Sequence, residues 1–240
     1  MDRKAVLLLC LFLLPGIALA QWDEGKEVRI KHNEFFVMGR YLNLEPINNF
    51  LSRQGLGYTP LGDNPMLYGV STKNRVGERL LWGLVAGTTI GEGIFDMLAP
   101  NMLKRSLERL GTDKSNKAEF TMMFAEAVVE YEFLKLGSFS LSAGGGLGFG
   151  GSVLTLLGEN SARFRILSSV INPIFCARYH FFEATGTGIL LSLIVSYDYF
   201  PNSTWLREAG KTPEPERFDM SGPSLWLTVG IPSTELTAQK

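Results

Sequence analysis

The residues best suited to chemistry in this chain are acids and bases that recur at every second position. In one segment, Glu126, Glu130 and Glu132 are separated by even numbers of residues. In another, Arg178 and His180 lie two residues apart. Residues two apart on an extended strand point to the same face, so each segment would gather its charges on one side. Such charges should form ion pairs, because an unpaired buried charge is costly. A selective pore or a proton path is the functional alternative.

Three other patterns could carry chemistry, but each is nonspecific. His32 and Glu34 lie two positions apart and would need a third ligand to coordinate a metal ion. His180 could only act in hydrolysis if it paired with a serine, and serines are so common in the alternating segments that such a pairing is nonspecific. The glycine-rich run 144–151 lacks the Lys-Ser/Thr continuation of a phosphate-binding loop. We therefore expect no catalytic residues, no cofactor and no metal site.

The composition of the 240-residue chain excludes several classes of protein. Apolar residues make up 45% and charged residues 20%, which excludes a disordered chain. A formal net charge of -1 offers no basic excess for nucleic acid, so no nucleic-acid partner is expected. The 26 glycines and 16 phenylalanines favour β-structure. After residue 20 no apolar run reaches the length of about 18 residues that a membrane-spanning helix needs.

Residues 1–20 have the three parts of a cleavable export signal. Two basic residues form its start, an apolar centre follows, and the small residues Ala18 and Ala20 precede a cut at Gln21. The mature domain is then 21–240. Its single cysteine, Cys176, allows no internal disulfide and is expected to be a small buried packing residue.

Alternation is the dominant pattern after residue 30 and predicts an all-β fold. It is clearest from Ile189 to Tyr199, where every second residue is apolar or aromatic. Eight strands are predicted, at 30–43, 65–74, 78–90, 118–135, 138–156, 163–182, 187–200 and 218–231. We expect these strands to form a single antiparallel up-and-down β-barrel.

The connections between the predicted strands differ in length. Short turns, each with a glycine, lie at 74–77, 136–137 and 183–186. Long segments lie at 44–64, 91–117 and 201–217. The long loops therefore fall at one end of the barrel and the short turns mainly at the other, as in outer-membrane barrels. Short helices are predicted within two long loops, at Pro46–Arg53 and over Leu103–Leu110, and the long loops are candidates for contact with a surface partner.

The second face of the strands indicates which side meets water. On a soluble barrel that face should be rich in charged residues and amides, but in 138–151 it carries serine and glycine. Such residues suit a narrow, filled lumen. We therefore expect the apolar face to meet lipid and the charges to pair inside. The predicted lumen network consists of Glu34, Arg40, Arg79, Glu126, Glu130, Glu132, Arg178 and His180.

Aromatic residues near the strand ends provide an independent indication. Membrane barrels carry girdles of aromatic side chains at both membrane interfaces. The predicted girdle at the end with short turns comprises Phe35, Tyr131, Phe133, Tyr179 and Phe181. The predicted girdle at the end with long loops comprises Tyr41, Tyr197 and Tyr199.

The alternating run 188–199, the glycine-rich run 140–151 and the closing strand 224–231 resemble those of the small eight-stranded outer-membrane β-barrel proteins of bacteria. The resemblance covers the mature chain and is one of pattern, without a diagnostic motif. It implies an outer-membrane location, contact with the lipid bilayer and with barrel-insertion machinery, and a structural or surface-interaction role.

Two features depart from that resemblance. The last predicted strand ends at Ile231-Pro232 before a polar tail, whereas such families usually end on an aromatic residue. The strands predicted at 118–135, 138–156 and 163–182 exceed the roughly 9–11 residues that span a membrane, so they are candidates for projection beyond it.

Two other functions remain open at this point. A soluble periplasmic barrel like a lipocalin would place the apolar face inside, around a hydrophobic ligand. A lipid-modifying enzyme of the outer membrane would use His180 and a serine. We expect neither, and predict that the protein is not an enzyme.

Overall fold

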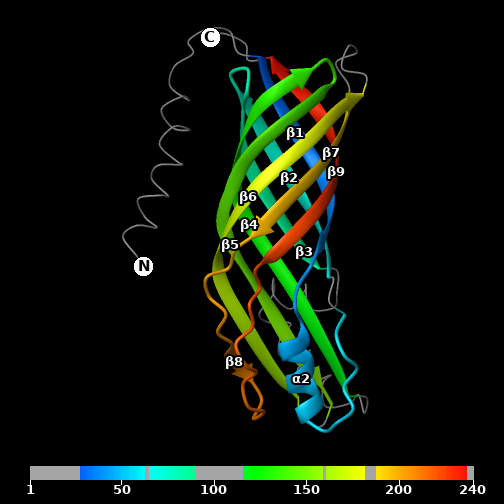
Figure 1. Cartoon of the computed structure of the whole chain (residues 1–240), viewed down its shortest axis with the longest axis vertical. Coiled ribbons are helices and arrows are strands. Elements are labelled where there is room, and N and C mark those ends of the chain that lie inside the picture. The colour runs from blue at the N-terminus through cyan, green and yellow to red at the C-terminus, as the bar shows by residue number, and fades with distance from the viewer. Residues whose placement is uncertain (1–27, 63–64, 90–115, 159–160, 182–187, 237–240) are drawn as a thin grey trace, which may run out of the picture.

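The computed structural model describes residues 28–62, 65–89, 116–158, 161–181 and 188–236, which form mostly β-strands (Figure 1). The long strands are β1 (Val28–Arg40), β2 (Met66–Val76), β3 (Leu80–Thr89), β4 (Lys117–Leu136), β5 (Phe139–Leu157), β6 (Ala162–Phe181), β7 (Ile189–Asp198) and β9 (Gly222–Leu236). A helix, α2 (Glu45–Arg53), and a short strand, β8 (Leu206–Ala209), lie in the connections.

The long strands form a closed ring. Each pairs antiparallel with the next in chain order from β1 to β7, and β9 pairs with both β7 and β1. Figure 1 shows the strands inclined to the long axis of the molecule, as closure of a sheet into a barrel requires. The prediction of an all-β, up-and-down barrel of eight strands is confirmed for the part of the chain that the structure describes.

Most predicted strand boundaries differ from the observed ones; for example, β1 ends at Arg40 rather than at 43, and β9 begins at Gly222 rather than at 218. Two further differences affect the interior of the barrel or its closure. The turn between β2 and β3 lies at Gly77–Arg79 rather than at 74–77, because Gly77 takes the positive φ of 61° that this turn uses. The last strand does not end at Ile231-Pro232, since β9 continues to Leu236. It continues because β1 offers it partners along its whole length, from Arg40 opposite Ser224 to Val28 opposite Leu236.

The two ends of the barrel differ as the loop lengths predict. The turns after β2 and β4 use glycines with positive φ, Gly77 and Gly137. At the opposite end, β4, β5 and β6 project beyond their neighbours and lie beside α2 and β8 (Figure 1). The helix predicted at Pro46–Arg53 is confirmed as α2, whereas the one predicted over Leu103–Leu110 lies outside the described residues. No helix within the described ranges is long and apolar enough to cross a membrane.

The projecting end, which we call the outer cap, comprises α2, β8, the chain between β7 and β9, and the ends of β4–β6. Its buried apolar residues are continuous with those inside the barrel. α2 buries Ile47, Phe50 and Leu51, and the Phe50 ring packs edge-on against Phe164 of β6, with ring centroids 5.9 Å apart. Phe164 in turn meets the ring of Trp205 edge-on at 6.5 Å. Each such contact fixes the cap to the barrel through burial of aromatic surface.

Candidate functional site: an ion-paired lumen inside an apolar barrel

Glu130 of β4 is the centre of a buried ion-pair network inside the barrel. One carboxylate oxygen lies 2.9 Å from Lys73 Nζ of β2. The other accepts hydrogen bonds from Arg178 of β6 and, at 2.8 Å, from Ser142 Oγ of β5. Lys73 also lies 3.4 Å from Glu34 of β1. All these side chains are buried. Charged side chains from four strands and the Ser142 hydroxyl from a fifth are thus joined in one network.

A second ion pair lies toward the turn between β2 and β3. Arg75 of β2 donates to both oxygens of Glu132 of β4, each at 3.1 Å. This paired arrangement is the stronger form of a guanidinium–carboxylate contact, because two parallel hydrogen bonds fix its geometry. It extends the same ladder of charges along the lumen, two residues beyond Glu130 and Lys73.

Arg40 forms a separate buried pair at the end of β1 nearest the outer cap. Its guanidinium lies 3.3 Å from Asp198 of β7 and donates to the backbone carbonyl of Met220 at 2.8 Å. It also lies 4.7 Å from the centroid of the Phe200 ring, a cation–π distance. Ser196 donates to the same aspartate at 3.1 Å. Arg40 therefore ties the mouth of the barrel to the chain that crosses it.

Aromatic side chains fill the lumen between these two charged regions. Trp226 of β9 lies with its ring centroid 5.0 Å from that of Phe36 and 5.7 Å from that of Phe124. Gly69 and Gly87 make room for these rings, because a Cβ at Gly69 would meet Phe36 and one at Gly87 would lie 2.8 Å from Phe124. The interior is thus packed rather than open at this level.

Glu126 of β4 has a different environment from Glu130. It accepts a hydrogen bond from the Asn172 amide at 2.5 Å, and none of the lysines and arginines that the structure describes forms an ion pair with it. Gly146 on the strand between them permits this contact, since a Cβ there would lie 2.6 Å from the Glu126 carboxylate. Glu126 therefore shares the lumen with the predicted network without direct ion pairing.

The two histidines face each other inside the barrel. His32 is fully buried, and His180 is half-buried with its ring edge-on to that of His32, at a centroid distance of 5.7 Å. No group of three or more His, Cys, Asp or Glu side chains suited to a metal ion occurs in the described part of the chain. His180, the residue that the enzyme hypothesis would use, thus packs against a second imidazole.

Arg79 is the one predicted lumen residue that the structure places outside. It is exposed in the turn after β2, where it donates to the Tyr131 hydroxyl at 3.4 Å. The prediction failed because the turn lies about three residues later than expected, which moves Arg79 out of the strand. The lumen cations of this region are Lys73 and Arg75 instead. Lys73 and Arg75 lie two and four residues after Ser71, which places all three on one face of β2. This spacing could have identified both cations from the sequence.

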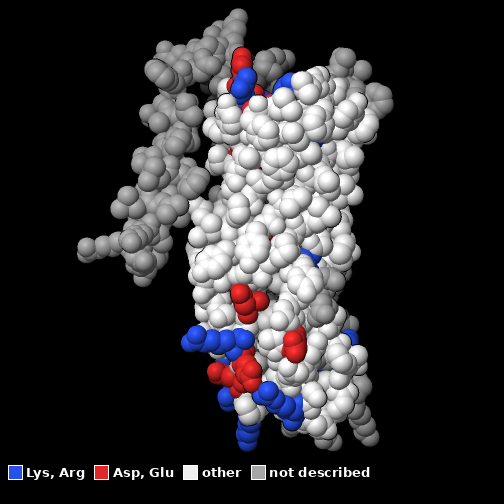
Figure 2. Space-filling view, viewed as in Figure 1, with Lys and Arg blue, Asp and Glu red and all other residues white. Residues whose placement is uncertain are grey.

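The outward face of the barrel is apolar. Leu193, Val195, Leu227 and Val229 are each about half exposed there, whereas the residues between them, such as Ser192, are buried inside. Figure 2 shows a broad, almost uncharged surface over the upper part of the barrel, between a few charged side chains at the top and a larger group of them in the lower part. A soluble barrel has the opposite polarity, because its outer face must be hydrated.

The protein is a membrane β-barrel. Its polarity is that of a barrel whose outward side chains meet hydrocarbon and whose polar groups are satisfied inside. The lipocalin-like alternative requires the apolar face inside, and this barrel has it outside.

The aromatic residues predicted to form girdles of the membrane barrel all lie on its outward face. Tyr131, Phe133, Tyr179 and Phe181 are near the short turns at the ends of β4 and β6. Tyr41, Tyr197 and Tyr199 are near the outer cap, at the ends of β1 and β7. Phe35 lies farther along β1, opposite Val70 and Val229. Their role as interfacial anchors stays a prediction.

Comparison with known proteins gives similarity only at the level of solved structures. No protein-family model matches the chain, and no curated protein matches it. Neisserial surface protein A is 10% identical over 88% of this chain and 100% of its own, with a TM-score of 0.47. The outer membrane protein OprG from Pseudomonas aeruginosa is 11% identical over 87% and 97%, with a TM-score of 0.46. A major outer membrane protein from Thermus thermophilus is 10% identical over 86% and 99%, with a TM-score of 0.45.

Proposed function

We propose that this membrane barrel resides in a bacterial outer membrane, where a filled, ion-paired lumen makes it a rigid support for the outer cap. The carrying observation is the contact of Glu130 with both Lys73 and Arg178, which joins side chains from β2, β4 and β6 across the interior. Ion pairs that join strands across the lumen support a structural role, because eight-stranded barrels have interiors just wide enough for side chains to fill.

The location follows from two features taken together. The chain begins with a predicted export signal at 1–20, and its barrel strands alternate between an apolar outer face and a polar lumen. Barrels of this polarity are inserted in outer membranes. The lipid bilayer and barrel-insertion machinery are therefore the partners proposed for the barrel itself.

The outer cap is the part of the molecule proposed to meet a partner at the cell surface. It includes the described portions of the predicted long loops 44–64 and 201–217; most of 91–117 lies outside the described residues. Charged side chains gather on this end in Figure 2, and Arg53 of α2 forms an exposed ion pair with Glu216 at 2.6 Å. Such a surface is held in place by the apolar core beneath it, so it can present charges in a fixed arrangement.

We propose no catalytic role for the lumen. Two of its glutamates are held by cations: Glu130 by Lys73 and Arg178, and Glu132 by Arg75. Glu126 is held by the Asn172 amide instead. A pore would require an open path, whereas Trp226, Phe36 and Phe124 pack together inside. In planar bilayers the purified protein should therefore show no stable conductance steps, and steady channel openings would favour the pore.

Cysteine labelling in intact cells tests the location and the orientation. Lys211→Cys places a thiol on an exposed residue of the cap, and Glu78→Cys places one in the exposed turn after β2. A membrane-impermeant maleimide should label Lys211→Cys in intact cells and Glu78→Cys only after the outer membrane is permeabilised. The parent chain, whose Cys176 is buried, is the blank. Labelling of Glu78→Cys alone in intact cells would reverse the orientation, and equal labelling of both would contradict insertion.

A further inference from the structure

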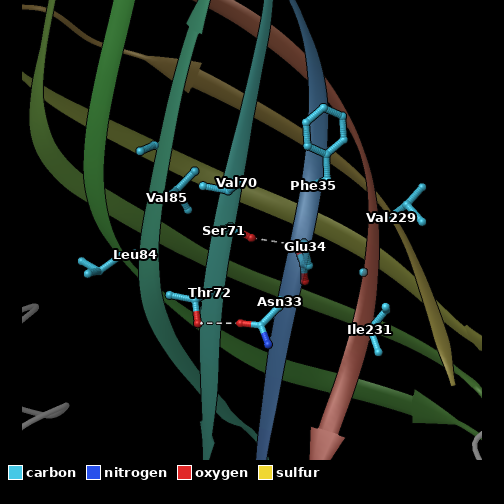
Figure 3. Close-up of a pocket in the computed structure, with 12 residues that line it drawn as sticks. Asn33, Glu34, Phe35, Val70, Ser71, Thr72, Leu84, Val85, Val229 and Ile231 are labelled. Atoms are coloured by element: carbon cyan, nitrogen blue, oxygen red, sulfur yellow. Dashed lines mark hydrogen bonds between the residues drawn. The ribbon is translucent and has the colours of Figure 1, made fainter. Parts of the chain in front are cut away.

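A groove of about 720 Å³ runs along the lipid-facing side of β1, β2, β3 and β9 (Figure 3). In Figure 3, Leu84 of β3 stands on one side of the β1–β2 pair, and Val229 and Ile231 of β9 stand on the other. Phe35 and Val70 line it between them, each more than half exposed. The groove is therefore bounded by large apolar side chains and opens away from the barrel.

One end of the groove is polar. Asn33 of β1 and Thr72 of β2 lie side by side on the outward face, where the Thr72 hydroxyl donates to the Asn33 carbonyl oxygen at 3.2 Å (Figure 3). The Asn33 amide nitrogen can still donate two hydrogen bonds, and no described residue accepts either of them. Lys31 follows two residues away on the same face of β1. Toward the short-turn end, the groove thus changes from apolar to hydrogen-bonding.

We infer that this groove binds a glycerophospholipid of the periplasmic leaflet, an inference that rests on the proposed outer-membrane location and orientation. One acyl chain lies between Leu84 and Val229, against Val70 and Ala86. The ester and phosphate oxygens of the lipid accept hydrogen bonds from the Asn33 amide. The acyl chain is inferred because the groove is continuous with the apolar outer face of the barrel. The hydrogen bonds are inferred because the groove ends at the Asn33 amide, whose N–H groups have no acceptor among the described residues.

The energetic reason is the cost of polar groups in hydrocarbon. An amide without an acceptor is costly in the bilayer core, so Asn33 is suited to the depth at which lipid ester oxygens begin. The apolar part of the groove has no such acceptors to offer, and a flexible hydrocarbon chain fills it without desolvating any polar group. A phospholipid has the same arrangement: its ester and phosphate oxygens would lie at the polar end of the groove, and its acyl chain would lie along the apolar part.

Photo-cross-linking of the full mature chain in liposomes tests this site. The probe is a phosphatidylethanolamine with a diazirine on one acyl chain, mixed into phosphatidylethanolamine–phosphatidylglycerol vesicles, and labelled residues are mapped by mass spectrometry. Labelling should concentrate on Val70 and Ala86. Ala86→Trp fills the groove and should lower that labelling several-fold. Ala143→Trp, at an exposed alanine of β5 outside the groove, is the matched control and should leave it unchanged. Asn33→Leu should lower it as well.

Two further measurements distinguish failure of the lipid site from failure of the membrane location: flotation of the same vesicles, and the shift of the unboiled band on gels. A protein that floats and shifts but is labelled evenly around the belt would overturn the lipid site alone. Cross-links between two copies of the chain at Phe35 or Val70 would also overturn it, in favour of a dimer interface. A protein that neither floats nor shifts would overturn the membrane location, and the lipid site with it.

Discussion

Glu130 and Arg178 form a buried ion pair although their strands, β4 and β6, are separated by β5. Ser142 of β5 lies between them, donating to Glu130 at 2.8 Å and accepting from Arg178 at 3.1 Å. The contact therefore spans three neighbouring strands on the inside of the curved sheet. Lys73 reaches the same carboxylate from β2 but is shared with Glu34. The two acids are thus balanced by two cations, and loss of either cation leaves one buried negative charge without compensation.

Replacing Arg178 with leucine should destabilise the barrel, because Glu130 loses its closest cation while remaining buried. Breaking one side of a buried pair costs about 3–5 kcal/mol. Urea unfolding in liposomes, followed by the loss of the shifted unboiled band, measures this change. Arg207→Leu is the control, since its pair with Glu214 is exposed at 4.0 Å and such pairs contribute about 0–1 kcal/mol. Equal midpoints for the two variants would contradict the network.

The two glutamates of β4 should respond differently to neutralisation. Glu130→Gln removes the charge that balances Lys73 and Arg178, so a loss of several kcal/mol is expected. Glu126→Gln keeps a carbonyl oxygen for the Asn172 amide, and its effect should be much smaller. The same unfolding measurement compares both variants at one pH. A larger loss for Glu126→Gln would show that the paired charges are assigned to the wrong residue.

Gly146→Ala should destabilise the barrel by overpacking. The new methyl group would meet the Asn172 side chain and lie 2.6 Å from the Glu126 carboxylate, and forcing extra volume into a filled interior costs about 1–3 kcal/mol. Gly39→Ala serves as the control, because its methyl group would find only ordinary contact with Met66 at 3.7 Å. If both alanines are tolerated equally in unfolding titrations, the lumen at Gly146 is not packed as described.

Phe218→Ala should loosen the outer cap while the barrel stays folded. Phe218 stacks on Trp205 with centroids 6.0 Å apart and meets Phe120 of β4 edge-on at 5.7 Å. Removing a buried phenylalanine side chain costs about 3–5 kcal/mol, and here the loss falls on the cap. Trypsin added to intact cells should cleave this variant faster than the parent. Leu206→Ala, at an exposed residue of β8, should leave the rate unchanged, and unchanged cleavage of Phe218→Ala would argue against the cap as a packed unit.

The sequence was sufficient to predict which side of a strand each side chain faces, because successive residues of a strand point to opposite sides. In β7 every second residue from Ile189 to Tyr197 faces outward, as the alternation predicts. Cys176 is buried for the same reason. The helix α2 was predictable from local signals, since a proline near its start and apolar residues at helical spacing identify it.

Partners inside the lumen were not predictable in the same way. The alternation shows whether a side chain points into the lumen or outward. It does not show the position of that side chain along the barrel axis, which depends on strand register. Arg40 thus pairs with Asp198 of β7 rather than with a glutamate of β4. Asp198 is absent from the predicted lumen network. Arg75 was missed because the second strand was predicted to end at residue 74, whereas β2 continues to Val76. Lys73 lay within the predicted strand but was not assigned to the lumen.

The apolar core of the outer cap was also missed. Trp205 and Phe218 lie in or beside a connection with no period of two or of 3.6 residues, and their contact depends on how that chain folds back over β4–β6. A pattern search has no signal for such contacts, because they join residues through tertiary packing alone.

Fractionation of cells that express the full chain, followed by gels with and without boiling, tests the central claim most directly. An apolar outer face around a charged interior requires detergent for extraction, and the folded barrel should migrate differently before and after boiling. That combination is the result we expect. Recovery in the soluble periplasmic fraction, with a single band in both lanes, would contradict the membrane barrel and require a partner that covers its apolar face in water.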